Sequence, residues 1–294
     1  MENDTLLHSG VRSEQAAWTK PTSTLQMLLL RHSVGDWAAT IAIGAIGFYL
    51  DKAAPFVRDI TPQLHDPSIS YPHTPGHRAL VPSWLLWHLC FTFPLGVICV
   101  AHILGAGGAR RLQSFNQAAL GLCSSIAVTL TIVCIVKNGY GRLRPDFLAR
   151  CEPVDGVCTG DARVIQEGRK SFPSGHTALS YAGLGYLSCF LWAELLHSQC
   201  HTLRLAGDLS KLLIASLPWM AALCIGLSRI EDYWHHWEDV SAGLLLGNFV
   251  AYTMYRLRYP RLSMGSEALA LNYSFGHIGQ PGKTKALADA RSCV

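Results

Sequence analysis

Three short polar segments of the chain carry residues whose types and spacing suit chemistry on a phosphate group. The first begins at Lys137 and reaches Arg144. The second is the run SFPSGH at residues 171–176, and the third is the run SRIEDYWHHWED at residues 228–239. Together they offer cations for phosphate oxygens and imidazoles for proton transfer or attack on phosphorus. The three segments therefore predict a phosphoryl-transfer site.

The binding part of this site is predicted from three cations and one helix start. An arginine presents a planar fork that matches phosphate oxygens, and a lysine presents a point charge, which suits Arg144, Arg229 and Lys137. Ser174 and Gly175 directly precede an apolar segment, where backbone N–H groups and the positive end of a helix hold an anion. We expect these residues to cradle a phosphate.

The reactive part is predicted from two histidines and one carboxylate. Asp239 lies four residues after His235, so the two side chains share one face if this stretch is already helical. The carboxylate would then fix the imidazole tautomer and stabilise the cation that forms. His235 is the predicted nucleophile, which gives a phosphohistidine. His176 is the predicted general acid, which protonates the leaving oxygen and later activates water.

Other roles are open for the same residues. Lys137 follows an apolar segment and can anchor it at a membrane interface. Arg142 and Arg144 can bind lipid headgroups. His176 can be an ordinary residue at a capped helix start.

A metal site is a further alternative. His235, His236 and Asp239 could ligate an ion, with His176 as another ligand. Three cations in the same pocket would repel a divalent ion, so the prediction is a site without metal or any other cofactor.

The composition indicates which elements must position these residues. Of the 294 residues, 50% are hydrophobic and 15% are charged, whereas an ordinary soluble chain is about a quarter charged. So much apolar surface excludes a disordered chain. The net charge of +4 is too small to suggest a nucleic-acid partner.

The predicted fold class is an all-α integral membrane protein with six transmembrane helices in one bundle. A spanning helix needs about 20 predominantly apolar residues. The six candidates are Ser33–Leu50, Ser83–Leu104, Phe115–Val136, Thr177–Leu196, Leu212–Leu227 and Val240–Tyr255. Their few interior charges disfavour the alternative, a soluble all-α bundle. The bundle is expected to occupy residues 33–258, with polar tails at residues 1–32 and 259–294.

Charges in the loops predict the orientation in the membrane. Basic residues precede the first span, follow the sixth, and lie between the second and third and between the fourth and fifth, which places these ends in the cytosol. Both tails are then cytosolic, no signal peptide is visible, and the sequons at Asn3 and Asn272 are expected to stay unglycosylated. The three polar segments meet on the extracytosolic face. Residues 137–176 break the charge pattern with seven lysines and arginines, which phosphate binding would explain.

Two features of the extracytosolic loops are open. Cys151 and Cys158 lie close together in a polar segment and either form a disulfide or stay free. The segment Lys52–Pro82 either lies along the membrane surface near the site, where it would guide a lipid headgroup, or is a plain surface loop.

The order of the three segments resembles the type 2 phosphatidic acid phosphatase superfamily. The shared pattern is Lys-x6-Arg-Pro, then Pro-Ser-Gly-His, then Ser-Arg-x5-His-x3-Asp. The stretch GRLRPDFL at 141–148, the nearby Cys151 and the stretch DYWHHWED at 232–239 are similar to the lipid phosphate phosphatase branch, above all to fungal and plant enzymes that act on phosphatidate and diacylglycerol pyrophosphate. The resemblance covers roughly residues 33–258.

This resemblance implies a six-span fold with cytosolic termini and magnesium-independent hydrolysis of lipid phosphates held in the bilayer, namely phosphatidate, diacylglycerol pyrophosphate and lysophosphatidate. It implies the same roles as the residues themselves: an acid at His176, a nucleophile at His235 and an orienting carboxylate at Asp239. The phosphate-binding residues that it implies are Lys137, Arg144, Ser174, Gly175 and Arg229. It leaves the oligomeric state open.

Three other functions compete. A polyprenyl diphosphate phosphatase would use the same residues on a longer lipid. Vanadium-dependent haloperoxidases resemble this residue set with vanadate in place of phosphate, but they are soluble, so six spans speak against them. A non-catalytic lipid-phosphate-binding relative, or an anion transporter, needs neither two histidines nor Asp239.

Overall fold

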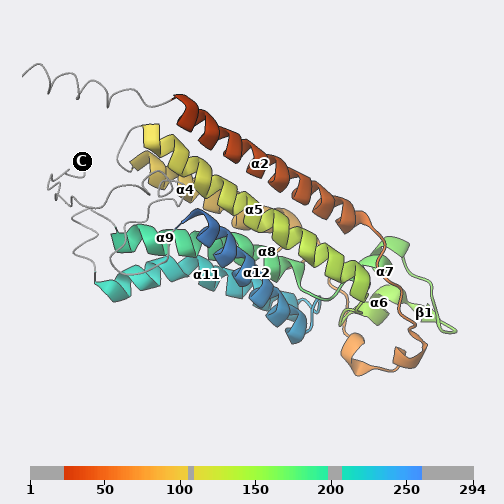
Figure 1. Ribbon diagram of the computed structural model, residues 1–294. Helices are drawn as coiled ribbons and strands as arrows, with labels where there is room; N and C mark the ends of the chain where they lie inside the picture. Colours follow the sequence, from red (N-terminus) through yellow and green to blue (C-terminus); the bar gives the residue numbers. More distant parts are fainter. Residues whose placement is uncertain (1–22, 105–108, 198–206, 260–294) are drawn as a thin grey trace, which may run out of the picture. The chain divides into compact units, whose positions relative to one another are not determined.

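The computed structural model describes residues 23–104, 109–197 and 207–259, and this part of the chain is predominantly helical (Figure 1). The chain divides into two units, residues 1–39 and 40–294. The helix α2 (Ser23–Lys52) begins in the first unit and ends in the second. Residues 1–22 and 260–294, which hold the sequons and most of both predicted tails, lie outside the described residues.

Within the second unit, long helical runs lie side by side (Figure 1). The helix α12 (Trp237–Arg258) packs on α5 (Ala109–Tyr140) and on a run formed by α8 (Gly175–Ser180), the π-helical turn η4 (Tyr181–Gly185) and α9 (Tyr186–His197). The helix α11 (Asp208–Glu231) packs on the same run. A further run, α3 (Ser83–Trp87), the π-helical turn η3 (His88–Thr92) and α4 (Phe93–Leu104), packs on α5 and η4.

Four helical segments of the described chain are long and apolar enough to cross a membrane: Ser33–Lys52, Ser83–Leu104, Ser114–Tyr140 and Asp208–Glu231. They coincide with four of the predicted spans and confirm the all-α class. The predicted spans Thr177–Leu196 and Val240–Tyr255 fall on α8–α9 and α12, which are not among the four. The first is divided by η4, and α12 carries acidic residues in its first turn and basic residues in its last. The count of six stays a prediction.

Two glycines let α12 approach α8 at backbone distance. A Cβ on Gly243 would lie 2.7 Å from the Ser174 carbonyl oxygen, and a Cβ on Gly247 would overlap the Ala178 carbonyl. These glycines are one turn apart on the same helix face, which is how small residues bring helix backbones together. As a result the first turns of α8 and α12 are adjacent, and the Ser174 N–H donates to the Asp239 carbonyl oxygen at 2.9 Å.

The polar connections between these helices form a compact layer with its own small core. Residues 53–82 contain the short helices η1 (Thr61–Gln63) and η2 (Pro67–Ile69). Residues 141–170 contain α6 (Phe147–Cys151), the hairpin of β1 (Pro153–Val154) and β2 (Val157–Cys158), and α7 (Ala162–Gly168). The shared core consists of Ile60, Ile69, Leu143, Phe147 and Cys151.

The segment 53–82 therefore covers residues 141–170. The Phe56 N–H donates to the Asn138 carbonyl oxygen at 2.7 Å. Gly141 takes a φ of 58°, and the Cβ that it lacks would overlap the Phe56 carbonyl, so the turn after α5 needs a glycine. The segment is packed on residues 141–170 through Ile60 and Ile69, and its two interpretations, a stretch along the membrane surface or a plain surface loop, both stay predictions.

The two loop cysteines are joined. Cys151 and Cys158 form a disulfide, which decides between the two alternatives for this pair. Cys151 is fully buried in the small core, so the bond ties the β hairpin to α6.

Candidate active site

One cavity of about 340 Å³ is lined by residues from all three predicted segments. Its walls come from the ends of α2, α3, α5 and α8 and from the turn between α11 and α12. The predicted site residues that line it are Lys137, Arg144, Gly175, His176 and His235. The three others, Ser174, Arg229 and Asp239, are buried and do not line the cavity.

Arg144 is a buried cation, and some of its hydrogen-bond donors have no partner in the protein. Its Nη2 donates to the Glu167 carboxylate at 3.2 Å, whereas Nε and Nη1 have no hydrogen-bond partner. Its guanidinium carbon lies 4.6 Å from the centre of the Trp234 ring. Burial lowers the pKa of Arg144 to about 10, so the side chain is still charged at neutral pH. Such a guanidinium suits a phosphate with several acceptor oxygens.

The other two predicted cations differ in how they are held. The Lys137 ammonium lines the cavity and donates to the Lys170 carbonyl oxygen at 2.9 Å. Arg229 is fully buried and donates from Nη2 to the Asp232 carboxylate at 2.9 Å, while its Nη1 has no partner. Arg229 also holds the turn that carries His235, because its carbonyl oxygen accepts the N–H of His235 at 3.2 Å.

Ser174 acts as the N-cap of α8. Its hydroxyl oxygen accepts hydrogen bonds from the Thr177 N–H at 3.4 Å and the Thr177 hydroxyl at 2.9 Å. Its own N–H is bonded to the carbonyl of Asp239. Ser174 thus holds the helix start, and Gly175, which follows it, is the residue of this pair that lines the cavity.

The sequence-based premise that His235 and Asp239 lie on one face of the same helix is wrong. The helix α12 begins only at Trp237, because His236 is its N-cap and the Asp239 carboxylate accepts the His236 N–H at 3.0 Å. His235 lies in the preceding turn. Its Nδ1 is 3.7 Å from the Asp239 carboxylate and makes no hydrogen bond, so the ring and the carboxylate are close but not hydrogen-bonded.

Two residues outside the predicted catalytic and phosphate-binding set hold Asp239. The Arg142 guanidinium donates to Oδ1 at 2.7 Å, and the Ser171 hydroxyl donates to Oδ2 at 2.6 Å. Burial alone would raise the pKa of the Asp239 carboxyl, but its contacts with His235, His236 and Ser171 lower it. Arg142 thus pairs with a buried carboxylate, and headgroup binding by this residue stays a prediction.

Most of the basic residues in 137–176 have partners inside the protein, which corrects the expectation that their charges face a phosphate. Only Lys137 and Arg144 of this set line the cavity. Arg150 pairs with Asp146, Arg169 donates to the carbonyl of Arg58, and Lys170 donates to the carbonyl of Asp51.

The alternative of a metal site at His235, His236 and Asp239 finds no support among the described residues. Among the residues with described placement, no group of three or more His, Cys, Asp and Glu side chains could hold an ion. The Asp239 oxygens accept hydrogen bonds from Arg142, Ser171 and His236 instead.

Both site histidines are held in the neutral form. Burial lowers the pKa of His235 to about 3, and the charges of Arg144 and Lys137 act in the same direction. Burial, and after it the charges of Arg229, Lys137 and Arg144, place the pKa of His176 well below its usual value. A neutral imidazole is the form that can attack phosphorus.

Acid should destabilise the fold through these histidines. A folded-state pKa below the unfolded value of about 6.5 means that unfolding takes up a proton at any pH between the two. For His235 the loss of stability between pH 7 and pH 5 is about 2 kcal/mol. We therefore expect the drop in Tm between pH 7 and pH 5, measured in detergent, to be smaller in His235→Gln than in the wild type. Equal drops would mean that His235 is not buried in the neutral form.

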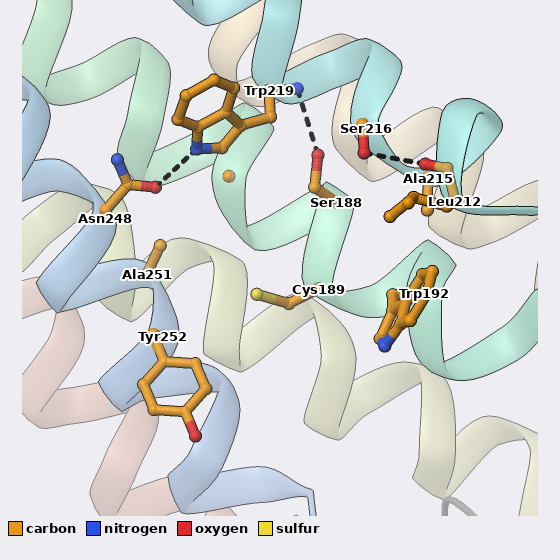
Figure 2. Close-up of a pocket in the computed structure, with 11 residues that line it drawn as sticks. Ser188, Cys189, Trp192, Leu212, Ala215, Ser216, Trp219, Asn248, Ala251 and Tyr252 are labelled. Carbon is orange, nitrogen blue, oxygen red and sulfur yellow. Dashed lines mark hydrogen bonds between the residues drawn. The ribbon is translucent and has the colours of Figure 1, made fainter. Parts of the chain in front are cut away.

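A second pocket, of about 320 Å³, lies between α9, α11 and α12 (Figure 2). There the Trp219 indole donates to the Asn248 side-chain oxygen at 3.0 Å, and the Trp219 N–H donates to the Ser188 hydroxyl oxygen at 3.1 Å. None of the predicted site residues lines this pocket. The candidate chemistry therefore belongs to the first cavity.

Comparison with known proteins finds relatives that belong to one superfamily. The sequence pattern of the PAP2 superfamily matches residues 118–263. Lipid phosphate phosphatase 2 of Arabidopsis thaliana is 34% identical over 78% of this chain and 78% of its own length. Probable diacylglycerol pyrophosphate phosphatase 1 of Schizosaccharomyces pombe is 37% identical over 77% of this chain and 81% of its own length. Diacylglycerol pyrophosphate phosphatase 1 of Saccharomyces cerevisiae is 34% identical over 70% of this chain and 72% of its own length. No solved structure matches the chain.

These matches and the apolar helices identify an integral membrane enzyme of the phosphohydrolase class. The chain belongs to the PAP2 superfamily. The family and the enzyme class predicted from the sequence are thereby confirmed.

Proposed function

We propose that this protein releases phosphate from membrane lipids, by hydrolysing the monoesters phosphatidate and lysophosphatidate and the terminal anhydride of diacylglycerol pyrophosphate. The observation that carries the proposal is the single cavity that brings together two cations, Lys137 and Arg144, and two histidines, His176 and His235. Relatives whose names state lipid phosphate or diacylglycerol pyrophosphate as substrate support the substrate class.

In the first step the neutral His235 ring attacks phosphorus. A phosphorus–nitrogen bond forms, the bond from phosphorus to the lipid oxygen breaks, and His176 gives that oxygen its proton. The substrate itself supplies negative charge beside His176, which raises the pKa of this histidine from its low value in the protein alone and lets it carry the proton. Asp239, fixed by Arg142 and Ser171, stabilises the positive charge that develops on His235.

In the second step water replaces the histidine. His176 takes a proton from the water molecule, whose oxygen attacks phosphorus while the bond to His235 breaks. Inorganic phosphate leaves, and both rings return to their starting forms. The phosphoryl charge is balanced by Lys137, Arg144 and Arg229. The end of α8 that faces the phosphoryl group is shaped by Ser174 and Gly175. No step requires a cofactor.

The walls of the cavity suit a lipid. Besides the polar groups, they include apolar side chains from α2, α3, α5 and α8, namely Phe48, Leu86, Trp87, Leu130, Val133 and Leu179. A phosphate group bound among the cations would leave its glycerol and acyl chains against this apolar surface. The same surface would accept a longer polyprenyl chain, so the walls alone do not choose between these lipids.

We also propose that the cavity faces the extracytosolic side, that both tails are cytosolic, and that residues 33–258 form the six-span catalytic domain. The disulfide between Cys151 and Cys158 supports this side for the loops, because disulfides persist in oxidising compartments. The distribution of basic residues in the remaining loops supports the same orientation.

Phosphate release from lipids in mixed micelles with EDTA tests the proposal. We expect release from phosphatidate, diacylglycerol pyrophosphate and lysophosphatidate without added metal. Release confined to a polyprenyl diphosphate would favour that alternative, and bromide oxidation with vanadate but no phosphate release would favour a peroxidase. Retained phosphatidate binding without any release would indicate a non-catalytic relative.

A further inference from the structure

Trp234 lines the cavity beside Arg144, yet no catalytic step uses it. Its ring lines the cavity, 4.6 Å from the Arg144 guanidinium carbon and 5.0 Å from that of Arg150. The His176 ring meets it edge-on, with 6.5 Å between the ring centres. Its Nε1 donates to the Thr74 carbonyl oxygen at 2.9 Å. One indole therefore contacts Arg144, His176 and residues 53–82, which we call the covering segment because they cover residues 141–170.

The indole is fixed by the residues on its N-terminal side. Tyr233 takes a φ of 58° and stacks on Tyr71 with 4.7 Å between the ring centres. The Asp232 carboxylate accepts the Leu80 N–H at 3.0 Å. Three consecutive residues of the turn are thus attached to the covering segment, which leaves Trp234 little freedom to move relative to the cations.

Of the two arginines at this ring, Arg144 is the one that depends on it. Arg150 is paired with the buried carboxylate of Asp146, with Nε and Nη2 each 2.8 Å from a carboxylate oxygen. Arg144 has only the Glu167 carboxylate, whose side chain is half exposed, so solvent weakens that pair. Contact between a guanidinium and an aromatic face is strongest when the cation is desolvated, as Arg144 is.

We propose that Trp234 is a positioning residue for the hydrolysis: its ring holds the Arg144 guanidinium in the orientation that presents Nε and Nη1 to the substrate phosphate. The inference rests on the proposed function. The ring face is the part that acts, and the bond from Nε1 to Thr74 only orients it.

Two substitutions separate the ring face from the volume of the side chain. Trp234→Leu removes the face, and we expect it to raise the inhibition constant of inorganic phosphate and to lower kcat/KM, each by about 10-fold. Trp234→Phe keeps a face without Nε1 and should stay within about 3-fold of the wild type. Trp237→Leu is the matched control, because Trp237 lies three residues further on with 66% of its surface exposed, and it should leave both constants unchanged.

A double-variant cycle tests whether Trp234 acts through Arg144. Trp234→Leu should cost less than about 3-fold in kcat/KM when Arg144→Lys is already present. An equal cost in both backgrounds, or a Phe variant as impaired as the Leu variant with an unchanged Tm, would overturn the inference. A wild-type protein that releases no phosphate from any lipid would refute the proposed function instead.

Discussion

His235→Asn is expected to abolish turnover, with phosphate release falling by about 10⁴-fold or more, as for other enzymes that lose their nucleophile. The variant places a smaller but neutral and polar group in a position that is 2% exposed, which introduces no buried charge, so the fold should survive. The expected loss is large because the proposed mechanism uses His176, the other imidazole at the cavity, as the acid, and the acid cannot also attack.

Release of phosphate from phosphatidate and acid-labile phosphate on the denatured enzyme are the two measurements. The wild type, denatured during turnover, should carry acid-labile phosphate on histidine, and His235→Asn should carry none. His77→Asn is the control, because its exposed imidazole lies on the covering segment; it should behave as the wild type. Substantial turnover by His235→Asn would refute its role as nucleophile.

Arg144→Lys is expected to lower kcat/KM by about 100-fold, although the charge is kept. An ammonium replaces a planar fork, and the two donors that have no partner in the protein, Nε and Nη1, are lost with it. Because burial leaves little water to substitute for them, the substrate oxygens would lose hydrogen bonds outright.

The check is steady-state kinetics on phosphatidate, beside Arg163→Lys as the control. Arg163 lies on α7 in the same loop, is exposed, and should tolerate the change without effect. Near-normal efficiency of Arg144→Lys would show that Arg144 is an anchor for headgroups and does not contact the reacting phosphate.

Much of the site could be predicted because membrane-spanning lengths restrict where polar segments can lie. Long apolar runs predicted the helices, and the polar segments adjoin their ends, so Lys137, His176 and His235 were expected to converge. The structure places all three at one cavity. Residue types and spacing were sufficient here because the helix ends do the positioning.

The contacts that orient the site could not be predicted in the same way. Arg142 and Asp239 are far apart in the sequence, and no local spacing links a guanidinium to a distant carboxylate. The helical premise for His235 failed for a local reason, since His236 and Asp239 form a capping box that starts α12 two residues later. No local spacing predicts the Ser174 contacts either: its hydroxyl oxygen accepts from Thr177 and its N–H donates to the Asp239 carbonyl oxygen.

The close contact at Gly243 and Gly247 has a consequence for the study of inactive variants. It joins α8 and α12 through their main chains, so the contact that keeps these two helix ends together does not depend on the side chain of His235. Catalytically inactive variants should therefore keep the shape of the cavity that receives the lipid. This makes a protein such as His235→Asn a suitable trap for capturing an intact substrate.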